Sequence, residues 1–130
     1  MVVKILIFNL FFILISLSTV SSGKTIFGKA KVIDGDTIHI NNDKIRLHAI
    51  DAPETNQTCN KKSKVWNCGL ESTKFLKELI GNNKIECITQ GKDRYNRFIG
   101  VCYKDNLDLN SEMVLNGWAI AYRYYSKDYV

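Results

Sequence analysis

The stretch IDGDTIHINNDKIRLHAIDAPE, residues Ile33–Glu54, carries the signals that decide the fold. Apolar and polar residues alternate in Thr37–Ile40 and Lys44–Ile50, which is the pattern of half-buried β-strands. The segment between them, Asn41–Asp43, has the composition of a hairpin turn. The stretch therefore predicts two antiparallel strands, with charged side chains gathered where the strands end.

The same criteria predict one strand before this stretch, and two strands and two helices after it. The strands are Thr25–Ile33, Lys84–Thr89 and Arg97–Tyr103, and the helices are Gly69–Ile80 and Asp108–Asn116. Five short strands with a helix between the third and fourth match an α+β, mainly β architecture, the five-stranded OB-fold Greek-key barrel. A doubly wound parallel sheet needs strands that alternate with helices, so this order argues against it. Composition alone does not distinguish this barrel from another small α+β domain.

The helix over Gly69–Ile80 is the clearest element outside the opening stretch. Its apolar side chains form one stripe, namely Leu70, Phe75, Leu76, Leu79 and Ile80. Gly81 follows as a stop signal, and Asp108 is placed to cap the second helix. The polar, lysine-rich residues 51–67 predict a loop, and residues 118–125 predict a final extended segment.

The first 22 residues have the features of a secretory signal peptide. Lys4 precedes an apolar run over Ile5–Leu17, and the residues up to Ser22 are small and polar. An uncleaved anchor is the alternative, although a membrane span needs about 20 apolar residues. We expect cleavage near Ser22, a secreted or periplasmic location, and one domain over residues 25–130. Cleavage lowers the formal charge from +5 to +4, and a basic domain suits a polyanionic partner.

Four cysteines, all after residue 22, fit an exported protein with disulfides. No two of them form a CxxC pair, which argues against a zinc site. Three pairings are possible. We favour Cys59–Cys68, which closes a loop, and Cys87–Cys102, which links two strands across a turn. Free buried thiols are the alternative if the protein is not exported.

Charged residues of the opening stretch could form a metal and phosphate site. Asp36 and Asp51 are short carboxylates on rigid turns and suit a hard divalent cation such as Ca²⁺. Glu54 has the reach to address a water molecule, and Arg46 offers a planar fork of donors to a phosphate. In the alternative interpretation, Asp34 and Asp36 only form a turn.

A second cluster, DRYNR over Asp93–Arg97, lies on the predicted turn between the two cysteine-bearing strands. Arg97 could grip a phosphate, and the alternative is a surface turn closed by a salt bridge within the cluster. The run Tyr122–Tyr125 interleaves aromatic rings with an arginine, as base-stacking surfaces do, although core packing is the alternative. His39 and His48 have no partners at metal-ligand spacing, so both are expected to be surface histidines and not catalytic ones.

Four segments, IDGDT, IRLHAIDAPE, DRYNR and LNGWAIAYRYY, occur in an order and spacing that closely resemble the staphylococcal nuclease (thermonuclease) family. The resemblance covers the chain from about Lys29 onward. The cysteines and the WNCG segment resemble the secreted, disulfide-containing branch of that family. The resemblance implies an OB-fold barrel that hydrolyses DNA and RNA with Ca²⁺ and leaves 3′-phosphate ends.

The resemblance also implies a role for each matching residue. The calcium ligands would be Asp36, Asp51 and the carbonyl of Ala52. The residues acting on the reaction would be Arg46 and Arg97, on the scissile phosphate, and Glu54, on the attacking water. The side chains lining the nucleotide site would be Arg94, Tyr95, Tyr122 and Tyr124.

Two other functional classes stay open. One is a non-catalytic OB-fold module that binds single-stranded nucleic acid, and the other is an inactive remnant. The family normally continues past a position like Tyr129 with a third helix, so the resemblance implies exposed apolar surface and lower stability for this chain. The acids favour a nuclease, because binding alone needs none of them. We expect a monomer.

Overall fold

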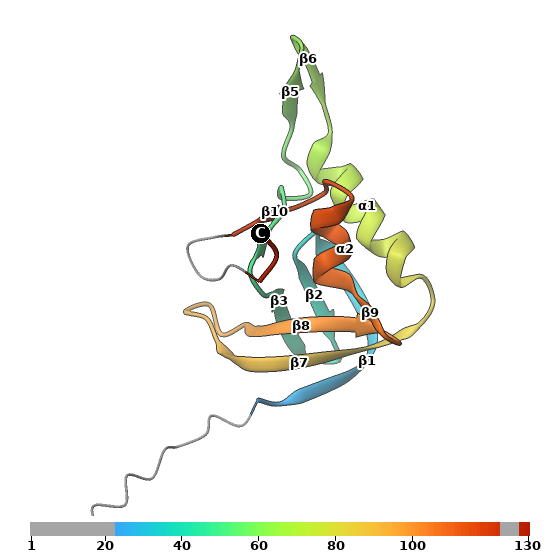
Figure 1. The fold of residues 1–130 in the computed structure, drawn as a ribbon, viewed down its shortest axis with the longest axis vertical. Helices are drawn as coiled ribbons and strands as arrows, with labels where there is room; N and C mark the ends of the chain where they lie inside the picture. The colour runs from blue at the N-terminus through green and yellow to red at the C-terminus, as the bar shows by residue number, and fades with distance from the viewer. Residues whose placement is uncertain (1–22, 123–127) are drawn as a thin grey trace, which may run out of the picture.

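Alternating apolar residues build five strands that close into a barrel at the centre of the molecule (Figure 1). The structure is a computed structural model that describes residues 23–122 and 128–130. The barrel strands are β1 (Thr25–Asp34), β2 (Thr37–Ile40), β3 (Asp43–Leu47), β7 (Lys84–Lys92) and β8 (Phe98–Lys104). They run in the order β3-β2-β1-β7-β8, and a parallel pairing of β3 with β8 closes the barrel. The short β9 (Leu107–Asp108) pairs with β8 in antiparallel orientation. The predicted OB-type fold is confirmed, and the predicted signal peptide lies outside the described residues.

The barrel interior is filled by alternate side chains of these strands. Ile38 and Ile40 of β2, and Ile45 and Leu47 of β3, are at most 1% exposed. The core also takes side chains from two helices, namely Leu76, Leu109 and Met113. Burying one such side chain contributes about 1.5–3 kcal/mol. This packing makes the strands a rigid support for the charged turns at their ends.

Both predicted helices, α1 (Cys68–Ile80) and α2 (Leu109–Leu115), are confirmed and lie on the same side of the barrel (Figure 1). The carboxylate of Asp108 caps α2 by accepting a hydrogen bond from the Ser111 amide at 2.9 Å. Among the residues that the structure describes, no helix has the length and apolar character needed to cross a membrane.

The first turns of α1 are polar on their buried side. Leu70, predicted to belong to the apolar stripe, is instead 49% exposed. The Ser72 hydroxyl donates to the Trp118 carbonyl at 2.8 Å, and the Thr73 hydroxyl lies 2.8 Å from that of Thr55. These hydrogen bonds hold this end of the helix against Trp118 and against the polar loop that follows Asp51.

The predicted third strand, Lys44–Ile50, is too long. β3 ends at Leu47, and Ala49 adopts a positive φ of 58°, which few residues other than glycine tolerate. The chain turns there, so β4 (Ile50–Asp51) leaves the barrel and pairs with β10 (Ile120–Ala121). This turn sets the position of Asp51.

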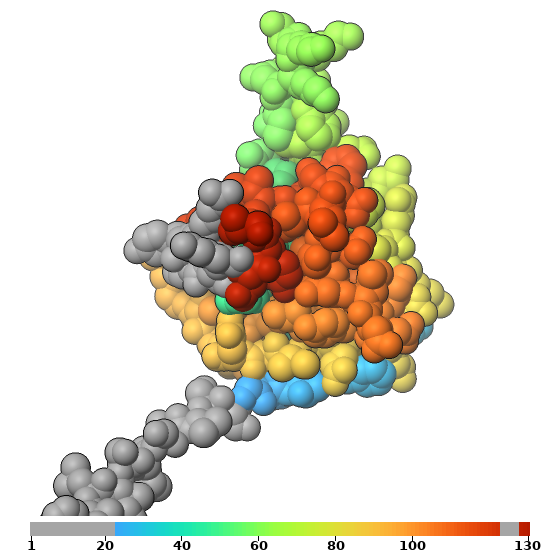
Figure 2. Space-filling view, in the orientation of Figure 1, coloured from blue at the N-terminus to red at the C-terminus, as the bar shows by residue number. Residues whose placement is uncertain are grey.

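The loop predicted over residues 51–67 is wrong for part of its length. β5 (Cys59–Lys61) and β6 (Lys64–Trp66) pair as an antiparallel hairpin that projects from the barrel (Figure 1, Figure 2). Its turn residues, Lys62 and Ser63, have φ of 50° and 65°, values that hairpin turns usually obtain from Asn-Gly. The sequence does not signal this hairpin, because it has neither those turn residues nor an apolar alternation.

Both predicted disulfides form. Cys59–Cys68 joins the start of the hairpin to the first residue of α1, with Cα atoms 5.6 Å apart. Cys87–Cys102 joins directly opposite residues of β7 and β8, and both cysteines are completely buried.

One buried side chain, Asn110, ties three backbone segments together. Its Oδ1 accepts a hydrogen bond from the Cys102 amide at 3.1 Å. Its Nδ2 donates to the carbonyls of His48 and Gly100 at 3.1 and 3.2 Å. Asn110 thereby links α2 to β8 and to the turn after β3, and no sequence pattern marks it because its partners are backbone groups.

Candidate active site

Arg46 on β3 lies between two carboxylates that come from different turns. Its Nη1 is 2.9 Å from Asp36 Oδ2, and its Nη2 is 3.1 Å from Asp51 Oδ1. Arg46 is directly opposite Thr37 in the β2–β3 pair, which places it beside the turn that carries Asp36. The structure therefore brings together three of the predicted site residues.

Asp36 is buried, with 6% of its surface exposed. Its carboxylate accepts hydrogen bonds from the Thr37 hydroxyl at 3.0 Å and from the Ala52 amide at 2.8 Å. Burial raises the pKa of Asp36, and the Arg46 charge and these hydrogen bonds offset only part of that rise. Another nearby positive charge would favour the ionised carboxylate, so the position suits a cation.

The oxygen donors of Asp36, Asp51 and Ala52, which we call the acidic corner, fit a hard divalent cation. The candidate ligands are the carboxylates of Asp36 and Asp51 and the carbonyl of Ala52. Ca²⁺ takes about 6–8 oxygen ligands, which water and a substrate phosphate can complete. Within residues 23–122 and 128–130, no three Asp, Glu, His or Cys side chains gather as a ready metal site. Three protein donors are fewer than the ligands that Ca²⁺ takes, so this donor set fits a cation that shares its coordination with a ligand.

Glu54 lies on a tight turn, two residues after Ala52. The Gln57 amide donates to the Glu54 carbonyl at 2.8 Å, and the Gln57 side chain accepts from the Glu54 amide at 3.3 Å. A hydrogen bond with the Asp34 carboxyl group, the charge of Asp34 and partial burial raise the pKa of Glu54. The charge of Asp36 raises this pKa further, and the charge of Arg46 lowers it. A raised pKa makes the ionised carboxylate a stronger base.

Asp34 supports this turn, a role that goes beyond the turn-forming one considered from sequence. Its Oδ1 accepts hydrogen bonds from the Thr55 amide at 2.7 Å and from the Thr55 hydroxyl at 2.6 Å. The residue after Glu54 is thereby fixed to the end of β1. Sequence reasoning missed the contact because the two residues are 21 positions apart.

Gly69 lets α1 pass directly against the Glu54 turn. A Cβ atom at this position would lie 1.6 Å from the Glu54 carbonyl oxygen. We therefore predict that Gly69→Ala displaces the turn, lowers the free energy of unfolding by about 1–3 kcal/mol and reduces activity. Urea unfolding measures the first effect. Lys74→Ala on the exposed side of α1 is the control, and equal stability of the two variants would show that this contact does not hold the turn.

Asp93 organises the turn between β7 and β8. Its Oδ1 accepts from the amides of Tyr95 and Arg97 at 2.9 and 3.0 Å. Its Oδ2 pairs with Arg97 Nε at 2.7 Å. The salt bridge considered as the alternative for this cluster is therefore present. Because it engages Nε, it orients the guanidinium and is compatible with a phosphate at the terminal nitrogens.

These contacts make the turn sensitive to acid. Burial acts to raise the pKa of Asp93, but hydrogen bonds from Arg97 and Tyr95 and the Arg97 charge outweigh it, so the pKa is lowered from 3.8. The ionised carboxylate therefore stabilises the fold above pH 3.8, and this stabilisation is lost as the pH falls through the lowered pKa.

We predict that Asp93→Asn lowers the melting temperature at neutral pH, and that its difference from the wild type shrinks below pH 3.8. Thermal melts over that range measure the effect, with Asp105→Asn as the control. A difference that stays constant as the pH falls would contradict the assignment.

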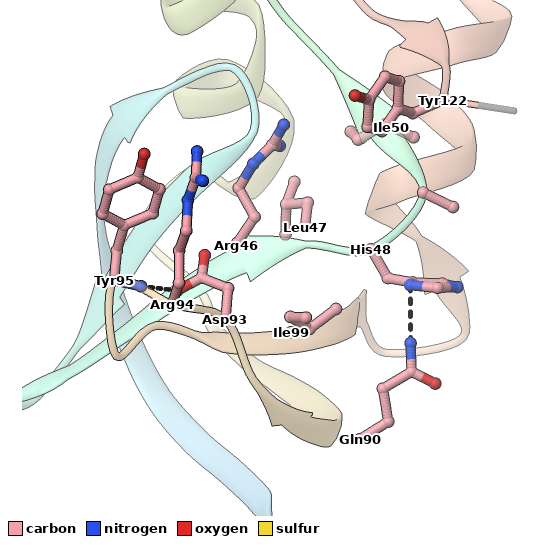
Figure 3. A pocket seen from close by; sticks show the side chains of 11 residues that line it. Arg46, Leu47, His48, Ile50, Gln90, Asp93, Arg94, Tyr95, Ile99 and Tyr122 are labelled. Atoms are coloured by element: carbon pink, nitrogen blue, oxygen red, sulfur yellow. Dashed lines mark hydrogen bonds between the residues drawn. The ribbon is translucent and has the colours of Figure 1, made fainter. Parts of the chain in front are cut away.

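A pocket of about 570 Å³ opens beside this turn (Figure 3). Its lining includes two arginines and two tyrosines, namely Arg46, Arg94, Tyr95 and Tyr122. In Figure 3 the side chains of Arg46, Arg94 and Tyr95 point in the same direction. The guanidinium groups of Arg94 and Arg97 lie 4.9 and 5.4 Å from the centre of the Tyr95 ring. Cations and aromatic rings on one concave surface suit phosphates and bases.

Arg46 connects the pocket to the acidic corner, because it lines the pocket and pairs with both carboxylates. The other predicted site residues of the described chain are not part of the pocket lining, namely Asp36, Asp51, Ala52, Glu54 and Arg97. Tyr124 lies outside the described residues.

His48, predicted to be a surface histidine, also lines the pocket and is only partly exposed (Figure 3). Its Nδ1 lies 2.7 Å from Gln90 Nε2, and its Nε2 lies 3.0 Å from Asp128 Oδ2. Only 14% of its side chain is exposed. The partners are 42 and 80 positions away, so no local pattern could have revealed them.

The protein is thus an OB-fold barrel in which an acidic corner lies beside a pocket lined by arginines and tyrosines. The family model described as "Staphylococcal nuclease homologue" matches residues 44–129. The chain belongs to the staphylococcal nuclease family.

Three curated proteins illustrate the similarity. An "Uncharacterized endonuclease" of Haemophilus influenzae is 37% identical over 130 residues, covering 96% of this chain and 68% of its own length. The "Succinoglycan biosynthesis protein ExoI" of Rhizobium meliloti is 36% identical over 102 residues, with 76% and 53% covered. The "Micrococcal nuclease" of Shigella flexneri is 30% identical over 110 residues, with 75% and 58% covered. The chain thus spans between about half and two thirds of the length of these relatives.

Proposed function

We propose that this chain is an exported nuclease that uses Ca²⁺ to hydrolyse the phosphodiester bonds of DNA and RNA, leaving 3′-phosphate ends. The observation that carries the proposal is the position of Arg46, paired with Asp36 and Asp51 and lining the pocket. Family membership and the nuclease names of two of these relatives support it. The nuclease domain would comprise residues 25–130.

The cation would be held by the carboxylates of Asp36 and Asp51 and the carbonyl of Ala52. When bound, it supplies positive charge that neutralises a phosphate oxygen. The two carboxylates belong to different turns, so one ion could join the β1–β2 turn to β4.

Glu54 would accept a proton from the attacking water, and its raised pKa suits that role. The water oxygen forms a bond to phosphorus while the bond from phosphorus to the 5′-oxygen breaks. The 5′-oxygen leaves as an alkoxide that takes a proton from solvent water, and the phosphate remains on the 3′ side. Arg46 and Arg97 would donate hydrogen bonds to the phosphate oxygens as negative charge builds on them.

The pocket would bind the nucleotide next to the scissile bond. Arg94 would pair with a phosphate, and the rings of Tyr95, Tyr122 and Tyr124 would contact the base or sugar. The phosphate groups are the same in DNA and RNA, so we propose both as substrates.

Export is supported by the two disulfides, because such bonds persist in oxidising compartments. We propose that residues 1–22 are a signal peptide removed near Ser22, and that the mature protein is a secreted or periplasmic monomer.

Cleavage assays on DNA and RNA test the function. We expect both to be cut with Ca²⁺, neither to be cut in excess EGTA, and the products to become substrates of a 3′-phosphatase. Cleavage unaffected by EGTA, or 5′-phosphate products, would contradict the proposal. Binding without cleavage in Ca²⁺ would instead assign the chain to non-catalytic modules that bind single-stranded nucleic acid.

A further inference from the structure

The β5–β6 hairpin stands outside the barrel and contributes nothing to the core. It rises from the body of the molecule as a narrow arm (Figure 1, Figure 2). Five of its six strand residues are exposed, and Val65 has 70% of its surface in contact with solvent. None of its residues belongs to the buried core cluster of the described chain. An element that buries so little does not owe its presence to stability.

The base of the arm is nevertheless firmly attached. The Cys59–Cys68 disulfide ties the start of β5 to the start of α1. Trp66, at the end of β6, packs edge-on against Trp118 with ring centres 6.3 Å apart. The tip is therefore held away from the barrel by a braced stem, and Trp66 is engaged in packing.

The tip carries a concentrated positive charge. Lys61, Lys62 and Lys64 are all exposed, and Thr55–Cys68 contains no aspartate or glutamate. Among the residues that the structure describes, no ion pair involves these three lysines. Three like charges on adjacent positions repel one another, so this arrangement favours an anionic partner.

The arm also lies next to the proposed reaction centre along the chain. Only four residues separate Glu54 from β5. The first of them, Thr55, is fixed to Asp34, and the amide of Gly69 binds the Gln57 carbonyl at 3.1 Å. The connection is therefore short and held on both sides, so the arm has a fixed relation to the Glu54 turn.

We infer that the β5–β6 hairpin binds the phosphate backbone of a polynucleotide outside the cleaved bond. The inference rests on the proposed nuclease function and adds a preference for long substrates. Each strand of three residues spans about 10 Å, over which a DNA duplex presents about six phosphate charges. Three lysines can therefore reach separate phosphates. Because Trp66 packs on Trp118, the arm contacts the backbone and reads no base sequence.

Charge removal tests the arm. The test variant is Lys61→Gln/Lys62→Gln/Lys64→Gln, and the matched control is Lys29→Gln/Lys31→Gln/Lys84→Gln on β1 and β7. Both are made in the full chain carrying Glu54→Gln, so that the nucleic acid stays intact in Ca²⁺. Affinity for a 30-base-pair duplex is measured over a range of salt concentrations.

We expect the slope of log K against log salt to become shallower by about 2–3 in the hairpin variant. The control should change the slope by less than about 1, and both variants should melt like the parent. With Glu54 restored, the hairpin variant should cleave long DNA less efficiently, whereas kcat/KM for a dinucleotide should equal that of the wild type. A dinucleotide is too short to reach the arm.

Equal slopes for the two variants, in a protein that cleaves both substrates, would contradict the binding role of the hairpin without contradicting the nuclease function. Failure of the wild type to cleave either substrate would overturn the nuclease function, and the arm with it. Loss of binding to phosphatidylserine vesicles, with unchanged binding to the duplex, would show that the arm serves a membrane surface instead.

Discussion

Glu54→Gln and Arg97→Ala are each expected to lower kcat on DNA by about 100- to 1,000-fold, which corresponds to about 2.7–4 kcal/mol. Glutamine cannot accept the proton of the attacking water, although it keeps the shape of the side chain. Alanine removes a guanidinium whose orientation is set by the Nε–Asp93 contact at 2.7 Å. Both changes act on the transition state more than on substrate binding, so KM should change less than kcat.

Matched controls separate these effects from unfolding. Glu86→Gln and Lys84→Ala alter exposed residues of β7 away from the site, and we expect wild-type rates for both. Arg97→Lys keeps the charge but loses the planar fork, so it should be intermediate. Urea unfolding should give similar stability for Glu54→Gln and the wild type. A rate for either site variant within a few-fold of wild type would remove that residue from the mechanism.

Replacement of Cys87 and Cys102 by alanine is expected to lower the free energy of unfolding by about 3 kcal/mol. The disulfide spans 15 positions and restricts the unfolded chain, and both cysteines are completely buried between β7 and β8. The small cavity left by two sulfur atoms adds to the loss. For a domain of this size the melting temperature should fall by roughly 12 °C or more.

The Cys59–Cys68 disulfide provides the comparison. It spans nine positions and holds a hairpin that buries little, so the hairpin can loosen while the barrel stays folded. We expect alanine at both positions to cost clearly less in urea unfolding than alanine at Cys87 and Cys102. A larger cost for the hairpin pair would mean that the arm is part of the cooperative core.

The barrel could be predicted because its signals are local. Ile38, Ile40, Ile45 and Leu47 alternate with polar residues, and the structure buries all four. The cap at Asp108 follows from a single residue beside a helical pattern. Arg46 has the opposite parity to Ile45 and Leu47, so its place outside the core could also be predicted.

The remainder depends on backbone conformations and distant contacts. Asp51 meets Arg46 because the chain turns at Ala49, which adopts a positive φ of 58°. An alanine in the sequence does not indicate such a turn. The hairpin turn at Lys62–Ser63 also depends on positive φ angles, of 50° and 65°, at residues that do not indicate a turn in the sequence. His48 acquires its environment from Gln90 and from a residue 80 positions away. No periodicity in the sequence reports such contacts.

The arrangement around Arg46 places the proposed calcium ligands next to a pocket that can hold a nucleotide. Asp51 is the better ligand to substitute, because its side chain is half-exposed while Asp36 is buried among hydrogen bonds. Asp51→Asn should leave the barrel folded and remove one negative charge from the cation site.

The most direct measurement is the dependence of DNA cleavage on Ca²⁺ concentration for the wild type, Asp51→Asn and the control Asp43→Asn. We predict that Asp51→Asn raises the Ca²⁺ concentration needed for half-maximal activity by about 10-fold or more. Asp43→Asn, which alters a surface pair with Lys24, should match the wild type. Identical Ca²⁺ dependence in all three proteins would contradict the placement of the cation at this corner.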